Sequence, residues 1–252
     1  MKRVICLVPS LTETLIEAGI QVVGRTRYCI HPKTQVAQIP VVGGTKDVRW
    51  SLVEPLNADL LILDRQENPK RFADQSPIPF FATDVTSVEN VGSELARLAV
   101  ELGSEELRQI AKRWSIVAEQ KKNDLNSQSG EFWRSFPGVL EWWIEPKEEI
   151  AQVFYMIWRE PWMTISPDTF IGSMLIRLGV QLLPSFETHY PKIEIKDFVK
   201  PGSLILFSSE PYDFKKEREE LMKFNVACAL VDGESFSWFG IRSLKFLEEH
   251  LL

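Results

Sequence analysis

The chain has 252 residues, of which 44% are hydrophobic and 25% charged, and it carries a net charge of −6. This length accommodates one large domain or two lobes of about 100 residues each. The acidic balance argues against nucleic acid as a partner, because phosphate binding depends on clustered Lys and Arg. No apolar run approaches the roughly 18 residues that a transmembrane segment needs.

The N-terminus runs directly into an apolar strand. MKR is followed by VICLV, so residues 4–8 are expected to form the first core strand, with no signal peptide before it. As it stands, the sequence predicts a cytoplasmic protein, whereas a missing leader would predict a periplasmic or membrane-anchored one. Cys6, Cys29 and Cys228 are odd in number and scattered, which indicates buried thiols instead of disulfides.

Helix-start and helix-stop signals follow the first strand. Ser10 and Glu13 have the spacing of a capping box, and the helix is expected to end at Ala18 with Gly19 as its left-handed stop. Thr86 and Glu89 have the same spacing and open a helix that Gly103 ends. Further short strands are predicted at residues 22–26 and 41–42.

The longest helical pattern covers residues 104 to about 125. At about 1.5 Å per residue it would span roughly 30 Å, which favours a strut between two lobes over an ordinary surface helix. The predicted divisions are an N-terminal lobe at 1–103, a connecting helix at 104–128 and a C-terminal lobe at 129–252. The apolar positions of this helix are Leu107, Ile110, Ala111, Trp114, Val117 and Ala118.

One segment pattern occurs on both sides of this helix. LVEPLNADLLILD at 52–64 and FVKPGSLILFS at 198–208 each join a proline-broken stretch to a short apolar run. Helices closed by Gly19 and Gly179, and strands ending at Asp84 and Asp232, extend the repeat. Strands alternating with helices predict an α/β fold: two Rossmann-like lobes with mainly parallel sheets, joined by one long rigid helix.

In the second half, a helix is predicted at residues 170–178. Its apolar side chains follow a helical spacing, and Asp168 or Thr169 is the expected cap.

Catalytic motifs are missing from the sequence. It contains no GxGxxG after a strand, no GxxxxGK[ST] loop, no GxSxG, no HExxH and no CxxC. His31, His189 and His250 do not cluster along the chain. The prediction is therefore a protein that is not an enzyme and has no catalytic cofactor or bound metal ion of its own.

Aromatic side chains gather just past predicted strand ends, where α/β sheets bind ligands. Flat apolar rings beside a few polar groups suit a large, partly apolar ligand, and a macrocycle fits better than a sugar, which would require more Asn, Asp and Gln. The aromatic residues in these loops are Tyr28, Trp50, Trp158, Trp162, Tyr190, Phe236 and Trp238. The polar residues beside them include Asp64, Arg65, Arg159 and Arg242.

Several segments together resemble the class III substrate-binding proteins of ABC importers, in which a helical backbone joins two Rossmann-like lobes. The resemblance covers nearly the whole chain and is strongest to the cobalamin-binding branch. The segments that carry it are VPSLTETLIEAG, VVGGTKDVRW, NADLLILDRQEN, FATDVTSVEN, IWREPWMT, DTFIGSMLIRLG, SSEPYDFK and VDGESFSWFG.

This resemblance implies roles for single residues. Tyr28 falls where the family places a tyrosine against the corrin, and Trp162 falls near an aromatic wall of the second lobe. Tyr190 matches a position that tryptophan commonly occupies. Trp238 and Arg242 lie in a segment similar to the loop that closes over the ligand.

The sequence also departs from the family pattern. The tryptophans that cobalamin importers place on the first lobe fall here at about Thr45 and Asp64. The glutamates that dock to a permease fall near Ser51 and Lys196. Glu54 and Glu194 lie close by and are the candidates for docking.

These observations predict a monomeric binding protein for a corrinoid resembling cobalamin, held in a cleft between the lobes, with an ABC permease as a possible partner. The predicted ligand contacts are Tyr28, Asp64, Arg65, Arg159, Trp162, Tyr190, Trp238 and Arg242. Haem and a ferric siderophore are the alternative ligands; Tyr28, Tyr190 or His189 could bind the iron of haem. A cytoplasmic cofactor-handling protein or enzyme on the same scaffold is the alternative from another class.

Overall fold

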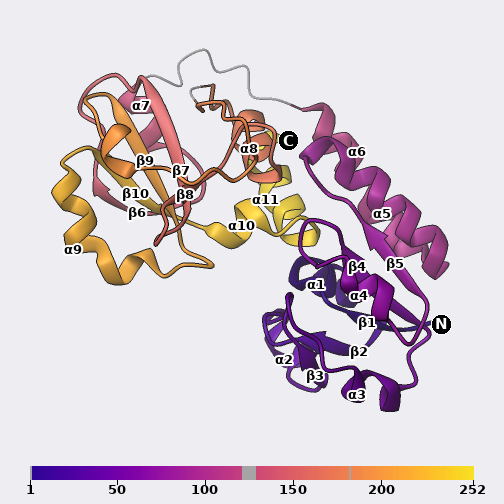
Figure 1. Ribbon diagram of the computed structural model, residues 1–252. Coiled ribbons are helices and arrows are strands. Elements are labelled where there is room, and N and C mark those ends of the chain that lie inside the picture. The colour runs from indigo at the N-terminus through magenta and orange to yellow at the C-terminus, as the bar shows by residue number, and fades with distance from the viewer. Residues whose placement is uncertain (1, 121–128, 182) are drawn as a thin grey trace. The chain divides into compact units, whose positions relative to one another are not determined.

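The computed structural model describes residues 2–120, 129–181 and 183–252 (Figure 1). By their internal contacts they form two compact units, which we call the first lobe (Met1–Glu119 with Trp238–Glu248) and the second lobe (Gln120–Ser237 with Glu249–Leu252). Each lobe contains a five-stranded sheet. Among the described residues, no helix has both the length and the apolar character that crossing a membrane requires.

The sheet of the first lobe is parallel throughout, in the order β3-β2-β1-β4-β5. All five residues of β4 are buried, as expected for a central strand covered on both faces. The elements are β1 (Arg3–Cys6), α1 (Pro9–Glu17), β2 (Gln21–Thr26), α2 (Lys33–Val36), β3 (Val41–Gly43), α3 (Trp50–Val53), η1 (Glu54–Leu56), β4 (Leu60–Asp64), α4 (Arg71–Gln75), β5 (Phe80–Thr83), α5 (Val88–Leu102), α6 (Glu105–Glu119) and α11 (Ile241–Leu251).

The sheet of the second lobe has the order β6-β10-β9-β7-β8, with parallel pairing in the centre and antiparallel strands β6 and β8 at its edges. The elements are α7 (Gly130–Arg134), β6 (Val139–Ile144), β7 (Gln152–Trp158), β8 (Met163–Thr164), α8 (Phe170–Arg177), η2 (Ile195–Asp197), β9 (Ser203–Ser208), η3 (Phe214–Glu217), α9 (Arg218–Leu221), η4 (Met222–Phe224), β10 (Ala227–Val231) and α10 (Gly233–Ser237).

The repeat predicted from the sequence corresponds to a repeat of strand order. In the first lobe the strands of the repeat lie as β1-β4-β5, and in the second lobe as β7-β9-β10. The predicted fold class, two Rossmann-like α/β lobes with mainly parallel sheets, is confirmed. The antiparallel edge strands β6 and β8 were not predicted.

Both predicted capping boxes were wrong in position. Helix α1 begins at Pro9 with Val8 as its N-cap, so Ser10 lies inside the helix. Helix α5 is capped by Ser87, whose backbone N–H donates to Asn90 Oδ1 at 3.2 Å. The helix stops were right, since Gly19 and Gly103 both adopt positive φ (70° and 64°).

Helix α6 has the predicted apolar face but a shorter described length. Ser104 caps it, because Ser104 Oγ accepts the backbone N–H of Leu107 at 3.2 Å. The structure describes the helix from Glu105 to Glu119. Residues 121–128 lie outside the described residues, so the predicted continuation to residue 125 and the limit at 128 stay predictions.

The last helix, α11, belongs to the first lobe as far as Glu248. Trp114 Nε1 donates to Gly240 O at 3.2 Å, and Ile241 N donates to Thr14 Oγ1 at 2.9 Å. A Cβ on Gly240 would lie 2.2 Å from Thr14 Oγ1, so this close approach requires glycine. The sequence-based division had grouped residues 129–252 together, whereas these contacts group Trp238–Glu248 with the N-terminal residues.

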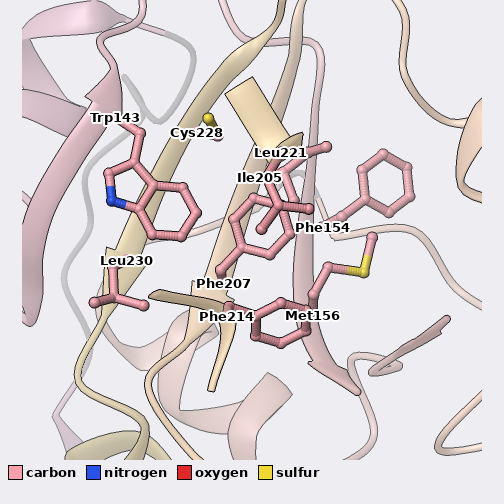
Figure 2. Close-up of a cluster of buried hydrophobic side chains, with 9 residues drawn as sticks. All are labelled: Trp143, Phe154, Met156, Ile205, Phe207, Phe214, Leu221, Cys228 and Leu230. Carbon is pink, nitrogen blue, oxygen red and sulfur yellow. The ribbon is translucent and has the colours of Figure 1, made fainter. Parts of the chain in front are cut away.

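A largely aromatic core covers one face of the second-lobe sheet (Figure 2). The ring of Phe207 on β9 stacks on Trp143 at 5.4 Å and packs against Phe214 at 5.0 Å between ring centroids. Phe214 and Leu221, from η3 and α9, cover this face. The core consists of Trp143, Phe154, Met156, Ile205, Phe207, Phe214, Leu221, Cys228 and Leu230.

Candidate functional site

In parallel sheets, the loops that follow the carboxyl ends of the strands are the usual ligand-binding region. We call the loops after β2, β4 and β5 the first-lobe edge, and the loops after β7, β9 and β10 the second-lobe edge. Tyr28 and Arg65 lie on the first-lobe edge, directly beyond β2 and β4. Arg159 lies on the second-lobe edge, directly beyond β7.

Tyr28 exposes a large aromatic ring on the first-lobe edge. The residue is 51% exposed, and its backbone N–H donates to Thr26 Oγ1 at 3.2 Å. The Arg27 guanidinium carbon lies 5.1 Å from the centre of the Tyr28 ring, and Asp47 holds Arg27 through two hydrogen bonds of 3.1 and 2.6 Å. Arg27, held by Asp47, therefore lies against the Tyr28 ring, and the exposed part of the ring remains accessible to a ligand.

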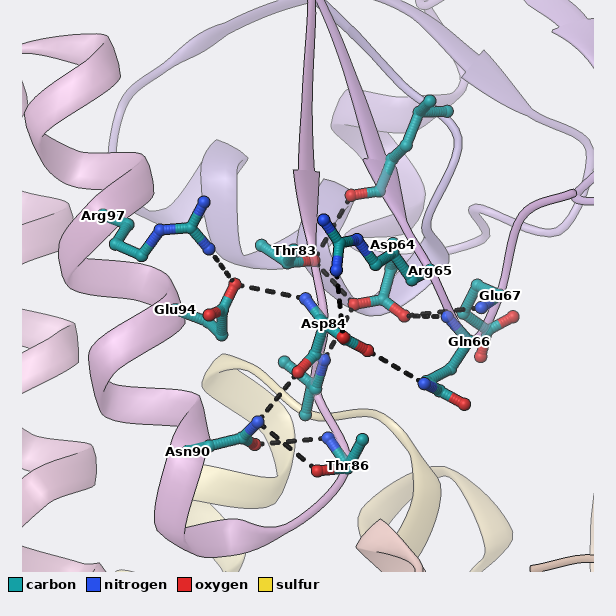
Figure 3. Close-up of polar contacts among 12 residues, drawn as sticks. Asp64, Arg65, Gln66, Glu67, Thr83, Asp84, Thr86, Asn90, Glu94 and Arg97 are labelled. Carbon is teal, nitrogen blue, oxygen red and sulfur yellow. Dashed lines mark hydrogen bonds and ion pairs between the residues drawn. The ribbon is translucent and has the colours of Figure 1, made fainter. Parts of the chain in front are cut away.

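Asp64 occupies a different position from the one its predicted role requires. The residue is fully buried at the end of β4, so its carboxylate does not reach solvent. Its Oδ1 accepts the N–H groups of Gln66 and Glu67 at 2.8 and 3.4 Å, and its Oδ2 accepts the N–H of Val85 and the Thr83 hydroxyl at 3.1 and 2.7 Å (Figure 3). We therefore conclude that Asp64 fixes the loops after β4 and β5 and does not contact a ligand directly.

Burial raises the pKa of Asp64 above its ordinary value, and the Thr83 hydroxyl offsets part of this shift. A protonated carboxyl has an acceptor here, because Thr83 Oγ1 also lies 3.3 Å from Leu63 O and can donate there while accepting from Asp64. In the pH range between the unfolded and folded pKa values, the folded state holds more protons than the unfolded state. Its stability therefore falls as pH rises through that range.

Asp64→Asn is expected to remove this pH dependence. The difference in unfolding free energy, wild type minus variant, should decrease as pH rises above about 4, the ordinary pKa of an Asp side chain. Urea denaturation of both proteins at a series of pH values measures it. A difference that increases with pH would mean that the pKa of Asp64 is lowered in the folded protein.

Arg65 is the most exposed of the predicted site arginines. Its side chain is 71% exposed, and its Nη1 lies 3.5 Å from Asp84 Oδ2. At this distance the ion pair is weak, and most of the guanidinium faces solvent.

Arg159 and Trp162 lie together, but both are turned toward their own lobe. Arg159 forms ion pairs with Glu217 and with Glu220, the latter at 2.6 Å, and only 17% of its side chain is exposed. Its guanidinium carbon lies 5.3 Å from the centre of the Trp162 ring. That ring in turn stacks on Phe214 at 6.1 Å and 9°. Trp162 therefore supports the second-lobe core more than it lines an open surface.

Two other aromatic side chains are exposed in the second lobe. Trp158, at the end of β7, is 40% exposed and packs edge-on against Tyr212 at 5.4 Å. Tyr190 is also 40% exposed, beside His189, whose Nε2 lies 3.1 Å from Asp168 Oδ2. Trp158 was among the aromatic residues near strand ends but not among the predicted ligand contacts. Its position as the last residue of an apolar strand is the sequence feature that could have identified it as a candidate ligand contact.

Trp238 and Arg242 belong to the first lobe. Trp238 is buried, and its ring packs edge-on against His31 at 5.6 Å. Arg242 makes two hydrogen bonds to Glu13, at 3.0 and 2.7 Å, and its guanidinium carbon lies 5.5 Å from the centre of the Trp238 ring. These contacts occupy both side chains, and their predicted role over a ligand stays a prediction.

Glu54 and Glu194 are both exposed. Glu54 begins η1, ahead of β4, and Glu194 caps η2, ahead of β9. They thus occupy similar places in the two halves of the repeat. Their predicted docking role stays a prediction.

Within the described part of the chain, no three or more His, Cys, Asp or Glu side chains lie close enough together to hold a metal ion.

The fold was compared with known proteins. No protein-family model matches the sequence, and no curated protein matches it. Among solved structures, the periplasmic vitamin B12 binding protein BtuF of Vibrio cholerae aligns at 16% identity and a TM-score of 0.67, over 98% of this chain and 94% of that one.

Two further structures align as fully. A periplasmic haem-binding protein from Pseudomonas aeruginosa matches at 18% identity and a TM-score of 0.70, over 98% of this chain and 90% of that one. A possible iron-binding, periplasmic solute-binding protein from Staphylococcus epidermidis matches at 16% identity and a TM-score of 0.69, over 98% and 96%. At these identities the likeness concerns the fold, and the chain has the fold of the class III substrate-binding proteins of ABC importers.

Proposed function

We propose that this protein binds a metal chelate without transforming it, and that a corrinoid is its ligand. The observation that carries the proposal is the set of exposed aromatic rings, Tyr28 in the first lobe and Trp158 and Tyr190 in the second. Tyr28 follows β2 and Trp158 ends β7, and large exposed rings at the carboxyl ends of parallel strands favour a ligand with flat apolar faces. Stacking and burial at about 25 cal/mol per Å² would supply the affinity.

The ion pairs of three arginines in the candidate-site segments support a ligand with an uncharged rim. Arg27 is neutralised by Asp47, Arg159 by Glu217 and Glu220, and Arg242 by Glu13. A polyanionic chelate such as a ferric tris-catecholate would require several unpaired cations. A corrinoid, whose rim carries amides, does not.

Haem is the second candidate, and one observation favours it. The exposed phenol of Tyr28 lies beside the Arg27 guanidinium, 5.1 Å from the ring centre. A tyrosine oxygen can serve as an axial ligand of haem iron, and Tyr28 presents one on the first-lobe edge.

Titration with cyanocobalamin, dicyanocobinamide, ferric haem and a ferric tris-catecholate tests the proposal. The corrinoids are expected to quench tryptophan fluorescence with a micromolar Kd. Tyr28→Ala should weaken binding about 5- to 10-fold, because one stacking partner is lost. Phe80→Ala is the matched control: Phe80 is also exposed but begins β5, at the opposite end of the strand, so its Kd should equal that of the wild type.

Two outcomes would contradict the corrinoid proposal. One is the absence of quenching at high micromolar corrinoid together with saturable binding of haem or of the siderophore. The other is turnover of the bound chelate, which would point to an enzyme.

The same proposal includes delivery to an ABC permease, with Glu54 and Glu194 as its docking residues. Delivery requires the protein to lie on the outer side of the cytoplasmic membrane. Fractionation of the native protein tests this, since recovery in the cytosol alone would exclude direct service to an importer and leave chelate binding untouched.

A further inference from the structure

The buried carboxylate of Asp64 fixes the loop that follows β4. It accepts the backbone N–H of Gln66 at 2.8 Å, while its own N–H donates to Asn68 Oδ1 at 3.0 Å. Asn68 Nδ2 donates to Leu7 O at 3.2 Å, which ties the loop to the end of β1. The backbone on either side of Arg65 is therefore held from within the lobe.

The same carboxylate also fixes the loop that follows β5. Its Oδ2 accepts from Thr83 Oγ1 at 2.7 Å and from Val85 N at 3.1 Å, and these two residues flank Asp84. One buried side chain thus sets the positions of Arg65, Gln66 and Asp84 relative to one another (Figure 3).

Arg65, Gln66 and Asp84, which we call the rim patch, contact each other on the first-lobe edge. Gln66 Nε2 donates to Asp84 Oδ1 at 2.9 Å, and Arg65 Nη1 lies 3.5 Å from Asp84 Oδ2. In the described part of the chain, Arg65 Nε and Nη2 and Gln66 Oε1 make no hydrogen bond. The patch therefore offers both donors and an acceptor to a ligand.

The charge of the rim patch is balanced, because the Arg65 cation faces the Asp84 anion. An anionic group would gain from Arg65 but would also meet the Asp84 carboxylate. An amide or a hydroxyl group can accept a hydrogen bond from Arg65 and donate one to Asp84, so both residues stabilise it. The patch thus favours uncharged polar groups over carboxylates and catecholates.

We infer that the rim patch recognises amide or hydroxyl groups on the periphery of the bound chelate, and that Asp64 is a positioning residue that acts through it. This inference rests on the proposed function, because it assigns a part of the same binding surface.

The test uses cyanocobalamin, whose periphery carries amides, and the full chain. Arg65→Ala and Gln66→Ala are each expected to raise the Kd about 3- to 10-fold, as expected for the loss of a hydrogen bond to an uncharged group. The Kd of the wild type should change little between low and high salt. Arg108→Ala is the control, because Arg108 is also exposed and paired with a carboxylate but lies on α6, and its Kd should not change.

A double-mutant cycle tests the positioning role of Asp64. Asp64→Asn should weaken binding in the wild-type background and have little effect when Arg65 and Gln66 are both Ala. A purely structural role would give the same loss in both backgrounds and would overturn this part of the inference. Thr83→Val, which removes the hydroxyl bound to Asp64, serves if Asp64→Asn does not fold.

The remaining outcomes separate this inference from the proposed function. If the wild type binds cyanocobalamin and the Arg65 and Gln66 variants bind it equally well, the rim patch is overturned while the proposed function stands. If a ferric tris-catecholate binds, and the effect of Arg65→Ala grows at low salt, the preference for uncharged groups is overturned. If no chelate in the panel binds the wild type, both proposals fail.

Discussion

Trp114→Ala is expected to lower the free energy of unfolding of the first lobe by about 4 kcal/mol. The indole is fully buried on α6, and its Nε1 donates to Gly240 O at 3.2 Å. Truncation leaves a large cavity and removes one of the two hydrogen bonds that Gly240 O accepts, the other coming from Leu244 N at 3.1 Å. Because the indole contacts the residue that precedes α11, the variant should also loosen the C-terminal helix.

Urea denaturation followed by far-UV circular dichroism measures this change. Ile116→Ala is the matched control, since Ile116 lies on the same helix but is exposed, and its replacement should change stability by less than about 0.5 kcal/mol. Equal losses in the two variants would mean that Trp114 is not packed as described.

Phe207→Ala is expected to cost the second lobe about 3–5 kcal/mol. Phe207 is fully buried at the centre of the core in Figure 2, where its ring stacks on Trp143 and packs against Phe214. Removal of the ring takes away aromatic contacts on both sides and leaves a void between β9 and its cover. The first lobe has its own core, so the urea concentration at which it unfolds should change much less.

Tryptophan fluorescence during denaturation reports this loss, because Trp143 and Trp162 both pack against this core. Leu140→Ala on edge strand β6 is the control, since Leu140 is exposed. If the two variants unfold at the same urea concentration, the assignment of Phe207 to the centre of the core is wrong.

Hydrophobic pattern and the internal repeat were enough to predict the fold. The apolar run before Asp64 became the fully buried β4, and its counterpart before Ser208 became the fully buried β9. Burial on both faces leaves an unmistakable apolar signal in a parallel strand. Edge strands such as β8, with two residues, carry no comparable signal.

Capping residues were harder to predict than helix stops. Gly19 and Gly103 follow apolar helical patterns directly and adopt positive φ there, whereas Ser and Thr residues recur near helix starts and only one of them is the cap. Thr86 and Ser87 are neighbours, and Ser87 forms the capping box, together with Asn90 three residues later. Glu13 had the spacing for a capping box but instead pairs with Arg242, 229 residues away along the chain.

The candidate site was predicted in part. Tyr28 and Arg65 are exposed at the ends of strands, as their sequence positions indicated. Asp64 is the last residue of β4 and is fully buried, whereas Arg65 lies one residue beyond the strand and is exposed. Sequence alone identifies the loop but not which of its side chains points outward.

The packing of α11 makes the first lobe discontinuous along the chain. Its N-terminal part, up to Glu119, is synthesised first, but Trp238–Glu248 leave the ribosome only after Gln120–Ser237 of the second lobe. Domains generally fold as units during translation. The lobe that is begun first would therefore stay incomplete until almost the whole chain has been made, and a premature stop codon before Trp238 would damage the structure encoded at the beginning of the gene.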